Sequence, residues 1–182
     1  MKPLRWAALF VIAAMTGCSS MKPQDFANRR PELHIEEYFA GHTRAWGLFE
    51  DRLGTERREF AVDIAGTWDG RELVLDENFT YSDGETERRV WNITKTGPAT
   101  YEGRAADVIG TAAGEAAGNA LQWSYDMNLK VGGGTWRVRF DDWMFLQPDG
   151  VLLNRAHVYR WGVWIGTVSI FFQPQARPAA AG

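Results

Sequence analysis

Two adjacent carboxylates, Asp141 and Asp142, form the part of the sequence with the clearest chemical potential. They stand in a run of strand-forming residues, and neighbouring side chains of a strand point to opposite faces, so one carboxylate is directed toward the interior. A buried carboxylate is costly unless it is paired. The turn at residues 148–150 returns the next segment alongside, which brings Arg155 within reach across the ladder. The pair would either hold the polar head of a ligand or serve as a structural ion pair.

Cys18, the only cysteine of the chain, stands at the end of a signal-like N-terminus. Basic residues come first, an apolar run over residues 6–14 follows, and Thr16 and Gly17 are small. The apolar run is too short to span a bilayer, which needs about 20 residues. The pattern resembles a bacterial lipobox, although Met15 stands where leucine is more usual. It predicts a signal peptide over residues 1–17 and lipid attachment at Cys18; the alternative is an ordinary signal peptide with an incidental cysteine.

Signatures of catalysis are scarce. The chain has three histidines and lacks the HExxH, paired-cysteine and GxSxG patterns of common metal and nucleophile sites. An acid–base pair of Asp141 or Asp142 with Glu72 or Glu77 is not selected by any spacing. The sequence therefore predicts no catalytic residue, no metal site and no cofactor, and it favours a role other than that of an enzyme.

The charge of the chain excludes one class of partner. The net charge is −3 and the isoelectric point is about 5.6. Nucleic-acid-binding domains usually carry a basic patch or stripe. We therefore expect no nucleic acid among the partners.

Aromatic residues make up 13% of the chain, and tryptophans occur in most of the strand-like segments. If many point inward, they would line an apolar pocket with a few polar groups, as in small-molecule sites. The alternative is that they fill an ordinary core. The residues that we expect to contact such a ligand are Trp91, Trp123, Tyr125, Trp136, Trp143, Asp142, Arg139 and Arg155, with Arg89 as a further candidate and arginine orienting a carboxylate or phosphate head.

The segments that must position these residues are almost all strands. From Leu121 to Val131, six apolar residues alternate with polar ones, which is typical of a half-buried antiparallel strand. Turn signals such as Asp69-Gly70 and residues 148–150 separate further strand-like runs. The pattern predicts an all-β, antiparallel up-and-down meander of about 8–10 strands. Closure into a barrel would remove the exposed edges; a β-sandwich is the alternative.

Two stretches depart from this pattern. Residues 30–40 could form a short helix that closes one end of the barrel. Residues 110–119 contain three glycines, which fits either a strand with a close backbone approach or a mobile loop.

The chain is expected to hold one domain. Residues 18–32 are polar and read as a flexible tether, residues 33–174 form the barrel, and residues 175–182 are an alanine- and proline-rich tail. A single, acylated cysteine leaves no thiol for a disulfide, so the core alone must hold the fold.

Several motifs occur along the chain in a fixed order. They are Ala45-Trp46-Gly47-Leu48-Phe49, Asp51-Arg52-Leu53-Gly54, Tyr81-Ser82-Asp83-Gly84, Arg89-Val90-Trp91, Tyr101-Glu102-Gly103-Arg104-Ala105, Gly118-Asn119-Ala120, Phe140-Asp141-Asp142-Trp143-Met144 and Asn154-Arg155-Ala156. This series resembles the DUF3833 family of proteobacterial lipoproteins from about residue 39 to 172. The resemblance implies no assigned activity, although an association with genes for membrane fatty-acid modification is expected from it. A second, looser resemblance is to lipocalin-like (calycin-type) barrels.

These observations lead to one functional hypothesis and one rival. The hypothesis is a lipoprotein anchored in the cell envelope, with a barrel that binds a lipid, such as a fatty acid, or another apolar molecule. Ser19 after the cysteine favours the periplasmic face of the outer membrane in a Gram-negative host. The rival is a structural lipoprotein whose filled barrel binds an envelope protein; an enzyme of lipid modification is a third, weaker alternative.

Overall fold

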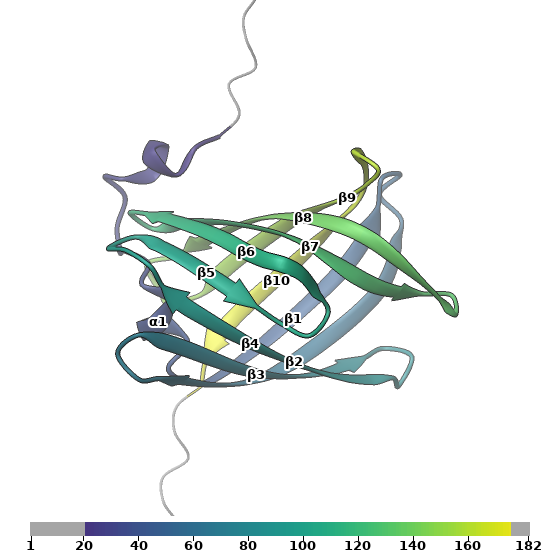
Figure 1. Cartoon of the computed structure of the whole chain (residues 1–182), viewed down its shortest axis with the longest axis horizontal. Coiled ribbons are helices and arrows are strands. Elements are labelled where there is room, and N and C mark those ends of the chain that lie inside the picture. The colour runs from purple at the N-terminus through teal and green to yellow at the C-terminus, as the bar shows by residue number, and fades with distance from the viewer. Residues whose placement is uncertain (1–20, 176–182) are drawn as a thin grey trace, which may run out of the picture.

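The chain forms a closed barrel of ten antiparallel strands, described over residues 21–175 in a computed structural model (Figure 1). Neighbours in sequence are neighbours in the barrel, and β1 closes it by pairing with β10. The predicted up-and-down meander is confirmed, and the β-sandwich alternative is wrong. The strands are β1 (Gly41–Asp51), β2 (Glu56–Trp68), β3 (Glu72–Tyr81), β4 (Thr86–Lys95), β5 (Thr100–Arg104), β6 (Val108–Ala117), β7 (Ala120–Val131), β8 (Gly134–Leu146), β9 (Leu152–Arg160) and β10 (Val163–Pro174).

The alternation of residue types along each strand decides which face is inside. In β7, Leu121, Trp123 and Met127 lie on the inner face and are buried, whereas the even-numbered positions between them point outward. Because the period of a strand is two, a slip of one residue would turn the whole apolar set to solvent. The register with β8, which places Trp123 opposite Asp142, is therefore strongly specified.

The glycine-rich stretch from residue 110 to 119 is mostly strand β6, so the strand alternative for this segment is right and the loop alternative is wrong. A Cβ on Gly114 would lie 2.3 Å from Cε3 of Trp123, and one on Gly103 of β5 would lie 2.6 Å from Cζ2 of the same ring. Both glycines leave room for the indole, which lies flat against the backbone of β5 and β6. Their role is a close approach between backbone and side chain.

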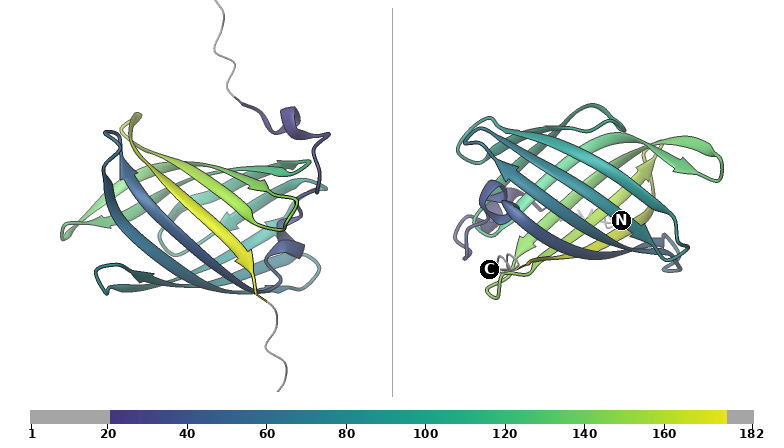
Figure 2. Two further views of the ribbon diagram at one scale, coloured as in Figure 1. Left: turned by 180° about the vertical axis from the view of Figure 1, so that it is seen from behind. Right: turned by 90° about the horizontal axis from the view of Figure 1, so that it is seen from below.

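The two ends of the barrel differ. One end, the closed end, is covered by the segment before β1, which contains the short helix α1 (Ile35–Tyr38) (Figures 1 and 2). Leu33, Ile35 and Phe39 of this segment are buried in the main core. The predicted helix is present but has only four residues. The other end, the mouth, is formed by the β1–β2, β3–β4, β5–β6, β7–β8 and β9–β10 connections (Figure 1).

The start of the described chain packs on the outside of the barrel. The 3-10 helix η1 (Pro23–Phe26) places the ring of Phe26 5.7 Å from Trp143 and 5.3 Å from Phe145. We predicted a flexible tether over residues 18–32; within its described part, Phe26 is buried against β7 and β8 and holds η1 on the barrel, while most of the residues around it are exposed. The predicted signal peptide, Cys18 and residues 176–182 of the tail lie outside the described residues.

Candidate functional site

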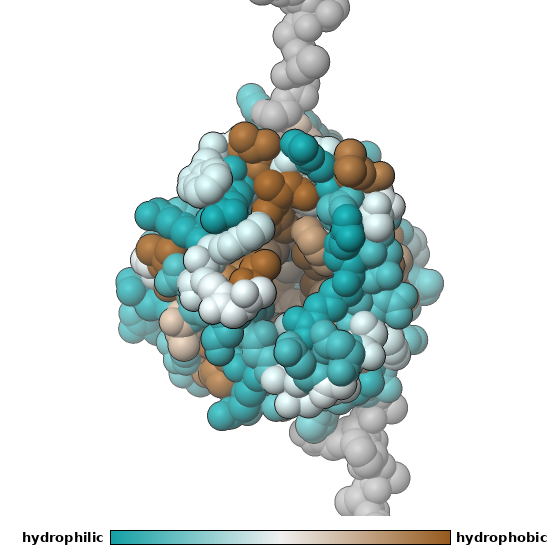
Figure 3. All heavy atoms as spheres, turned by 90° about the vertical axis from the view of Figure 1, so that its right-hand side faces the viewer, coloured by the Kyte–Doolittle hydropathy of each residue, from teal (hydrophilic) through white to brown (hydrophobic). Residues whose placement is uncertain are grey.

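The inner face of the barrel is packed near the closed end and hollow near the mouth. On β3, Leu73 and Leu75 are 1% and 5% exposed, yet Phe79 and Tyr81 on the same face remain partly exposed. β2 repeats this difference between buried Ile64 and partly exposed Phe60. Inward side chains can meet solvent only through an open lumen. Figure 3 shows this end hollowed, with apolar atoms inside and polar atoms around much of the rim.

Aromatic rings line the lumen where the packed half meets the hollow half. Trp91 and Trp123 are buried, and their ring centroids lie 5.8 Å apart in an edge-to-face arrangement. Tyr125 lies 5.3 Å from Trp91 and stacks on Phe140 at 5.1 Å. Three of the predicted ligand-contacting residues, Trp91, Trp123 and Tyr125, therefore share one inner wall. Such rings offer large apolar area with a defined geometry.

A charged group lies beside this wall. Nε of Arg89 donates to Oδ2 of Asp107 at 2.9 Å, and a second guanidinium nitrogen lies 3.5 Å from Oε1 of Glu87. Glu77 faces Arg89 across the β3–β4 pairing. Burial raises the pKa of Glu77 to about 7; Arg89 opposes this rise, whereas Asp107 and Glu87 add to it. The Glu77 carboxyl is thus poised to gain or lose a proton near neutral pH.

A second polar group on the inner face consists of Asp142 in β8 and Asn154 in β9, each 5% exposed. Nδ2 of Asn154 donates to Oδ1 of Asp142 at 3.1 Å. Oδ2 of Asp142 and Oδ1 of Asn154 find no hydrogen-bond partner within residues 21–175. Burial raises the pKa of Asp142 to about 7, although the hydrogen bond from Asn154 lowers it. Two buried oxygen atoms are thereby left available to a hydrogen-bond donor.

The predicted ion pair of Arg155 with Asp141 or Asp142 is wrong. The β8–β9 register pairs Asp142 with Ala156, so Arg155 points outward and lies opposite Trp143. Asp141 also points outward, where it accepts a hydrogen bond from Nε2 of Gln122 at 2.6 Å. The sequence did not reveal how many residues the turn between β8 and β9 uses, and an error of one residue reverses the face.

Trp143 and Arg139 also lie on the outer face, contrary to their expected place around a ligand in the barrel. The packing of Phe26 buries Trp143 from outside, so its burial does not mean that it faces the lumen. Arg139 is exposed and lies 3.6 Å from Asp126 of β7. Both residues sit at odd positions of β8, whereas its inward positions are even, Asp142 included.

Trp136 occupies an inward position of β8 near the mouth and remains partly exposed. The guanidinium of Arg160 lies over its ring, 3.7 Å from the centroid. Trp136 thus belongs to the rim of the lumen, away from the wall formed by Trp91 and Trp123.

Sequence reasoning missed Asn154 and Asp107 as members of the site. A signal for Asn154 was present, because it interrupts the inward apolar series Leu152, Ala156 and Val158 of β9. Asp142 interrupts the inward series of β8 in the same way. Asp107 lies in the β5–β6 turn and carried no such signal.

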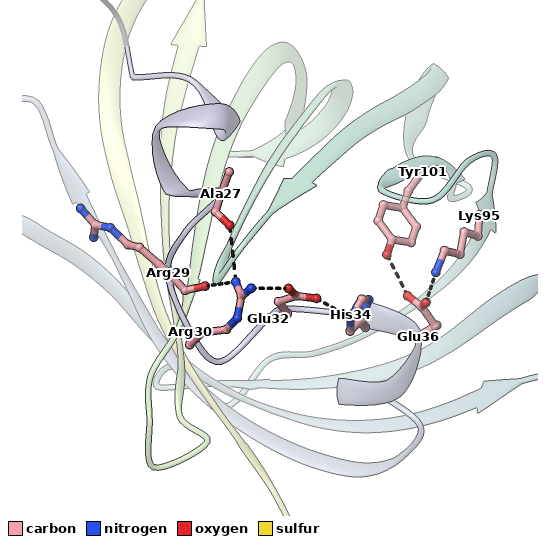
Figure 4. A network of polar contacts seen from close by, with 8 residues as sticks. All are labelled: Ala27, Arg29, Arg30, Glu32, His34, Glu36, Lys95 and Tyr101. Atoms are coloured by element: carbon pink, nitrogen blue, oxygen red, sulfur yellow. Dashed lines mark hydrogen bonds and ion pairs between the residues drawn. The ribbon is translucent and has the colours of Figure 1, made fainter.

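A separate polar cluster secures the closed end (Figure 4). Glu36 of α1 is buried and accepts hydrogen bonds from Lys95 and from the hydroxyl of Tyr101, the latter at 2.8 Å. Burial alone would raise the pKa of Glu36, but the contacts with Lys95 and Tyr101 outweigh it and hold the pKa below its ordinary value. The cluster ties α1 to β4 and β5 and keeps this end shut.

The match to a family model extends over residues 12–174, and the model describes a protein of unknown function, DUF3833. The chain belongs to the DUF3833 family. The predicted resemblance is therefore confirmed. None of the curated proteins compared with the chain matches it.

Solved structures of other proteins have the same lipocalin-like barrel fold as this DUF3833 chain. An S-type phycobiliprotein lyase from Guillardia theta is similar with a TM-score of 0.56 at 9% identity, covering 80% of this chain and 92% of the lyase chain. A DUF3598 protein of unknown function from Nostoc punctiforme has a TM-score of 0.55 at 14% identity, covering 80% of this chain and 51% of the other. At such identities the likeness shows the fold alone.

Two further findings concern the described part of the DUF3833 chain. Within residues 21–175, no cluster of three or more His, Cys, Asp or Glu side chains is placed to hold a metal ion. The same residues contain no helix with the length and apolar character needed to cross a membrane.

Proposed function

We propose that this protein is a membrane-anchored lipoprotein of the bacterial envelope that binds a lipid or another apolar small molecule in the hollow half of its barrel. The observation that carries the proposal is the lumen that opens at the mouth (Figure 3), with the inward rings of Trp91, Trp123 and Tyr125 deeper in the barrel. Apolar ligand surface buried there is stabilised by about 25 cal/mol per Å² before the costs of association. A solidly filled barrel, the rival hypothesis, leaves the partly exposed inward residues near the mouth without an explanation.

Anchoring through Cys18 suits the geometry of the described residues. Cys18 lies three positions before Met21, where the described chain begins. In Figures 1 and 2, η1 and the tips of the β1–β2 and β9–β10 hairpins lie on the same side of the barrel. A bilayer that holds acyl chains on Cys18 would pass close to both.

The two hairpin tips carry apolar side chains that suit a membrane surface. Leu53 and Trp161 are 80% and 86% exposed, and Val163 and Trp164 are also exposed. The backbone N–H of Arg52 donates to the carbonyl of Ile165 at 3.0 Å, which joins the two hairpins. Tryptophan favours the interface between lipid and water because its ring is apolar and its N–H is polar. This orientation would place the mouth beside the source of an apolar ligand, at the outer membrane if the sorting rule for Ser19 applies.

The test of the binding proposal is native mass spectrometry with lipid extraction on the mature chain carrying Cys18→Ser, purified from a bacterial periplasm. We expect a bound apolar species of defined mass. It should be lost in Trp91→Leu, whose indole lines the lumen, and kept in Trp46→Leu, whose indole is exposed on the outer face of β1. A wild-type protein that carries no ligand and takes up none of a panel of phospholipids, fatty acids and fatty alcohols would overturn the proposal.

A further inference from the structure

We infer that the lumen selects apolar ligands whose polar end donates hydrogen bonds and carries no negative charge, such as a hydroxyl or an amide N–H, and rejects free carboxylates and phosphates. The inference rests on the proposed function and names the ligand class of the same site. It departs from the sequence-based expectation that arginine would orient an anionic head.

The inner face near Arg89 carries more acidic than basic side chains. Arg89 is surrounded by the carboxylates of Glu77, Glu87 and Asp107, all of which lie close enough to influence it electrostatically. One guanidinium thus meets three acidic groups, and Asp142 adds a fourth carboxyl to the same region. An anionic ligand placed here would face a net negative field, and it would compete with Asp107 for a guanidinium that is already bound.

Carboxylate and amide oxygen atoms near the lumen are buried without a hydrogen-bond donor among the described residues. Oδ2 of Asp142, Oδ1 of Asn154 and Oδ1 of Asp107 are buried and lack a partner within residues 21–175, and all three accept hydrogen bonds when Asp142 is ionised, as it is at pH 8. An unpaired buried acceptor is satisfied by a donor, and a site of unpaired acceptors rejects a ligand that brings only acceptors. A ligand hydroxyl or N–H would supply the missing donor.

Other arginines of the barrel differ in how far they are open to an anionic ligand. Arg139 and Arg155 lie on the outer face, as described above. Arg58, near the mouth, is bound to Asp83 at 2.7 Å and to Glu85 at 2.5 Å, and its buried Nε has no hydrogen-bond partner within residues 21–175. Arg160 at the rim lies over the rings of Trp136 and Trp161, 3.7 and 4.1 Å from their centroids. Arg160, which has no carboxylate partner within residues 21–175, and the free Nε of Arg58 are therefore the groups that an anionic head would use if the inference were wrong.

The experiment compares two probes that share a ten-carbon chain and differ in the head, 1-decanol and decanoate. Each is titrated at pH 8 into the mature chain carrying Cys18→Ser, and binding is followed by tryptophan fluorescence, since Trp91 and Trp123 line the lumen. We expect decanol to bind at least tenfold more tightly than decanoate. Equal or tighter binding of decanoate would overturn the inference while leaving the proposed function intact, and its loss in Arg160→Ala or Arg58→Ala would show which arginine binds the head. If neither probe binds, the inference is overturned as well, and the proposed function is then decided by the mass spectrometry described above.

Two variants with a matched control separate head recognition from general stability. Glu77→Gln removes a negative charge from the lumen and should improve decanoate binding severalfold, which narrows the ratio between the probes. Asp142→Leu removes an acceptor and should weaken decanol severalfold. Asp141→Asn changes the neighbouring carboxylate on the outer face and should leave the ratio as in the wild type; an equal shift in Asp141→Asn and Glu77→Gln would contradict the inference. Far-UV circular dichroism confirms that each variant is folded.

Discussion

Asn154 donates a hydrogen bond to Asp142 from the neighbouring strand, with 3.1 Å between Nδ2 and Oδ1, and both residues face the interior of the barrel. The pair stands among apolar inward positions of β8 and β9. A buried carboxyl that is held by one amide is a costly feature for a structural protein. The Asp142–Asn154 pair gives the apolar interior of the barrel one polar group at a fixed position.

Asp142→Asn should change the dependence of stability on pH. The folded-state pKa of Asp142 is raised from 3.8 to about 7, so the protonated carboxyl is favoured by folding. The associated stability is present below about pH 4 and is lost as the pH rises toward 7. The asparagine side chain stays neutral at every pH. The free energy of unfolding of the variant should therefore exceed that of the wild type by on the order of 2–4 kcal/mol at pH 8 and equal it near pH 4.

Urea denaturation at both pH values measures the difference. Asp141→Asn, with its side chain on the outer face, serves as the control; the charge of Asp141 adds to the raised pKa of Asp142 less than burial does, so this variant should depart from the wild-type profile much less than Asp142→Asn. A profile of Asp142→Asn that runs parallel to that of the wild type would contradict the prediction.

Gly114→Ala should destabilise the barrel by about 1–3 kcal/mol, since overpacking of a filled interior costs this much. The new Cβ would lie 2.3 Å from the indole of Trp123, which is held on its other side by Trp91 and cannot move freely. Gly134→Ala is the matched control, because its Cβ would meet its nearest atom at 3.6 Å. Thermal unfolding of both variants checks this prediction. Equal melting temperatures would show that the Trp123 ring can move away from the new Cβ at no cost in stability.

Lys95→Met should loosen the closed end. Glu36 is buried, and the variant leaves its carboxylate with the Tyr101 hydroxyl but without its cation, at a cost of about 2–3 kcal/mol at pH 7. The pKa of Glu36 is lowered in the folded chain, so its contribution is present above about pH 4.5 and is lost as the pH falls through the folded-state pKa. The penalty of the variant should therefore shrink at acid pH, where Glu36 is protonated.

Urea denaturation of Lys95→Met at neutral and acid pH tests this sign. Lys130→Met, which alters an exposed lysine of β7, should be close to neutral at both. A penalty for Lys95→Met that is the same at both pH values would mean that packing, and not charge, holds the closed end.

Trp161→Asn should weaken membrane contact without weakening the fold. Trp161 and Gly162 form a two-residue hairpin loop in which both φ angles are positive, 53° and 76°. Asparagine is favoured in such a loop, whereas a bulky side chain there is strained. The variant should therefore be at least as stable as the wild type.

Co-sedimentation with phosphatidylethanolamine–phosphatidylglycerol vesicles provides the measurement, on mature protein carrying Cys18→Ser. We expect the bound fraction to fall severalfold in Trp161→Asn and to be unchanged in Trp46→Asn, whose tryptophan is exposed on the outer face of β1. Unchanged binding in both variants would show that Trp161 at the hairpin tip does not contribute to membrane contact.

The order and type of the elements follow from local patterns. Alternation over residues 121–131 predicts β7 because a strand repeats every two residues, and Asp-Gly pairs predict turns because they tolerate positive φ. Closure into a barrel follows from the need to pair the edges. The inward placement of Trp91, Trp123 and Tyr125 was also within reach of the sequence, since each falls on the apolar face of its strand.

The faces and partners around the site were decided by tertiary structure. Whether Arg155 meets Asp142 depends on the register set by one turn, and an offset of a single residue reverses the face. Trp143 is buried from outside by Phe26, a residue 117 positions earlier in the chain, which no local pattern reveals. Asp107 and Glu77 join Arg89 only because the barrel brings β3, β4 and the β5–β6 turn together. The sequence by itself determined the strands and their apolar faces, whereas only the closed barrel determined which polar groups meet in the lumen, because such meetings depend on long-range pairing.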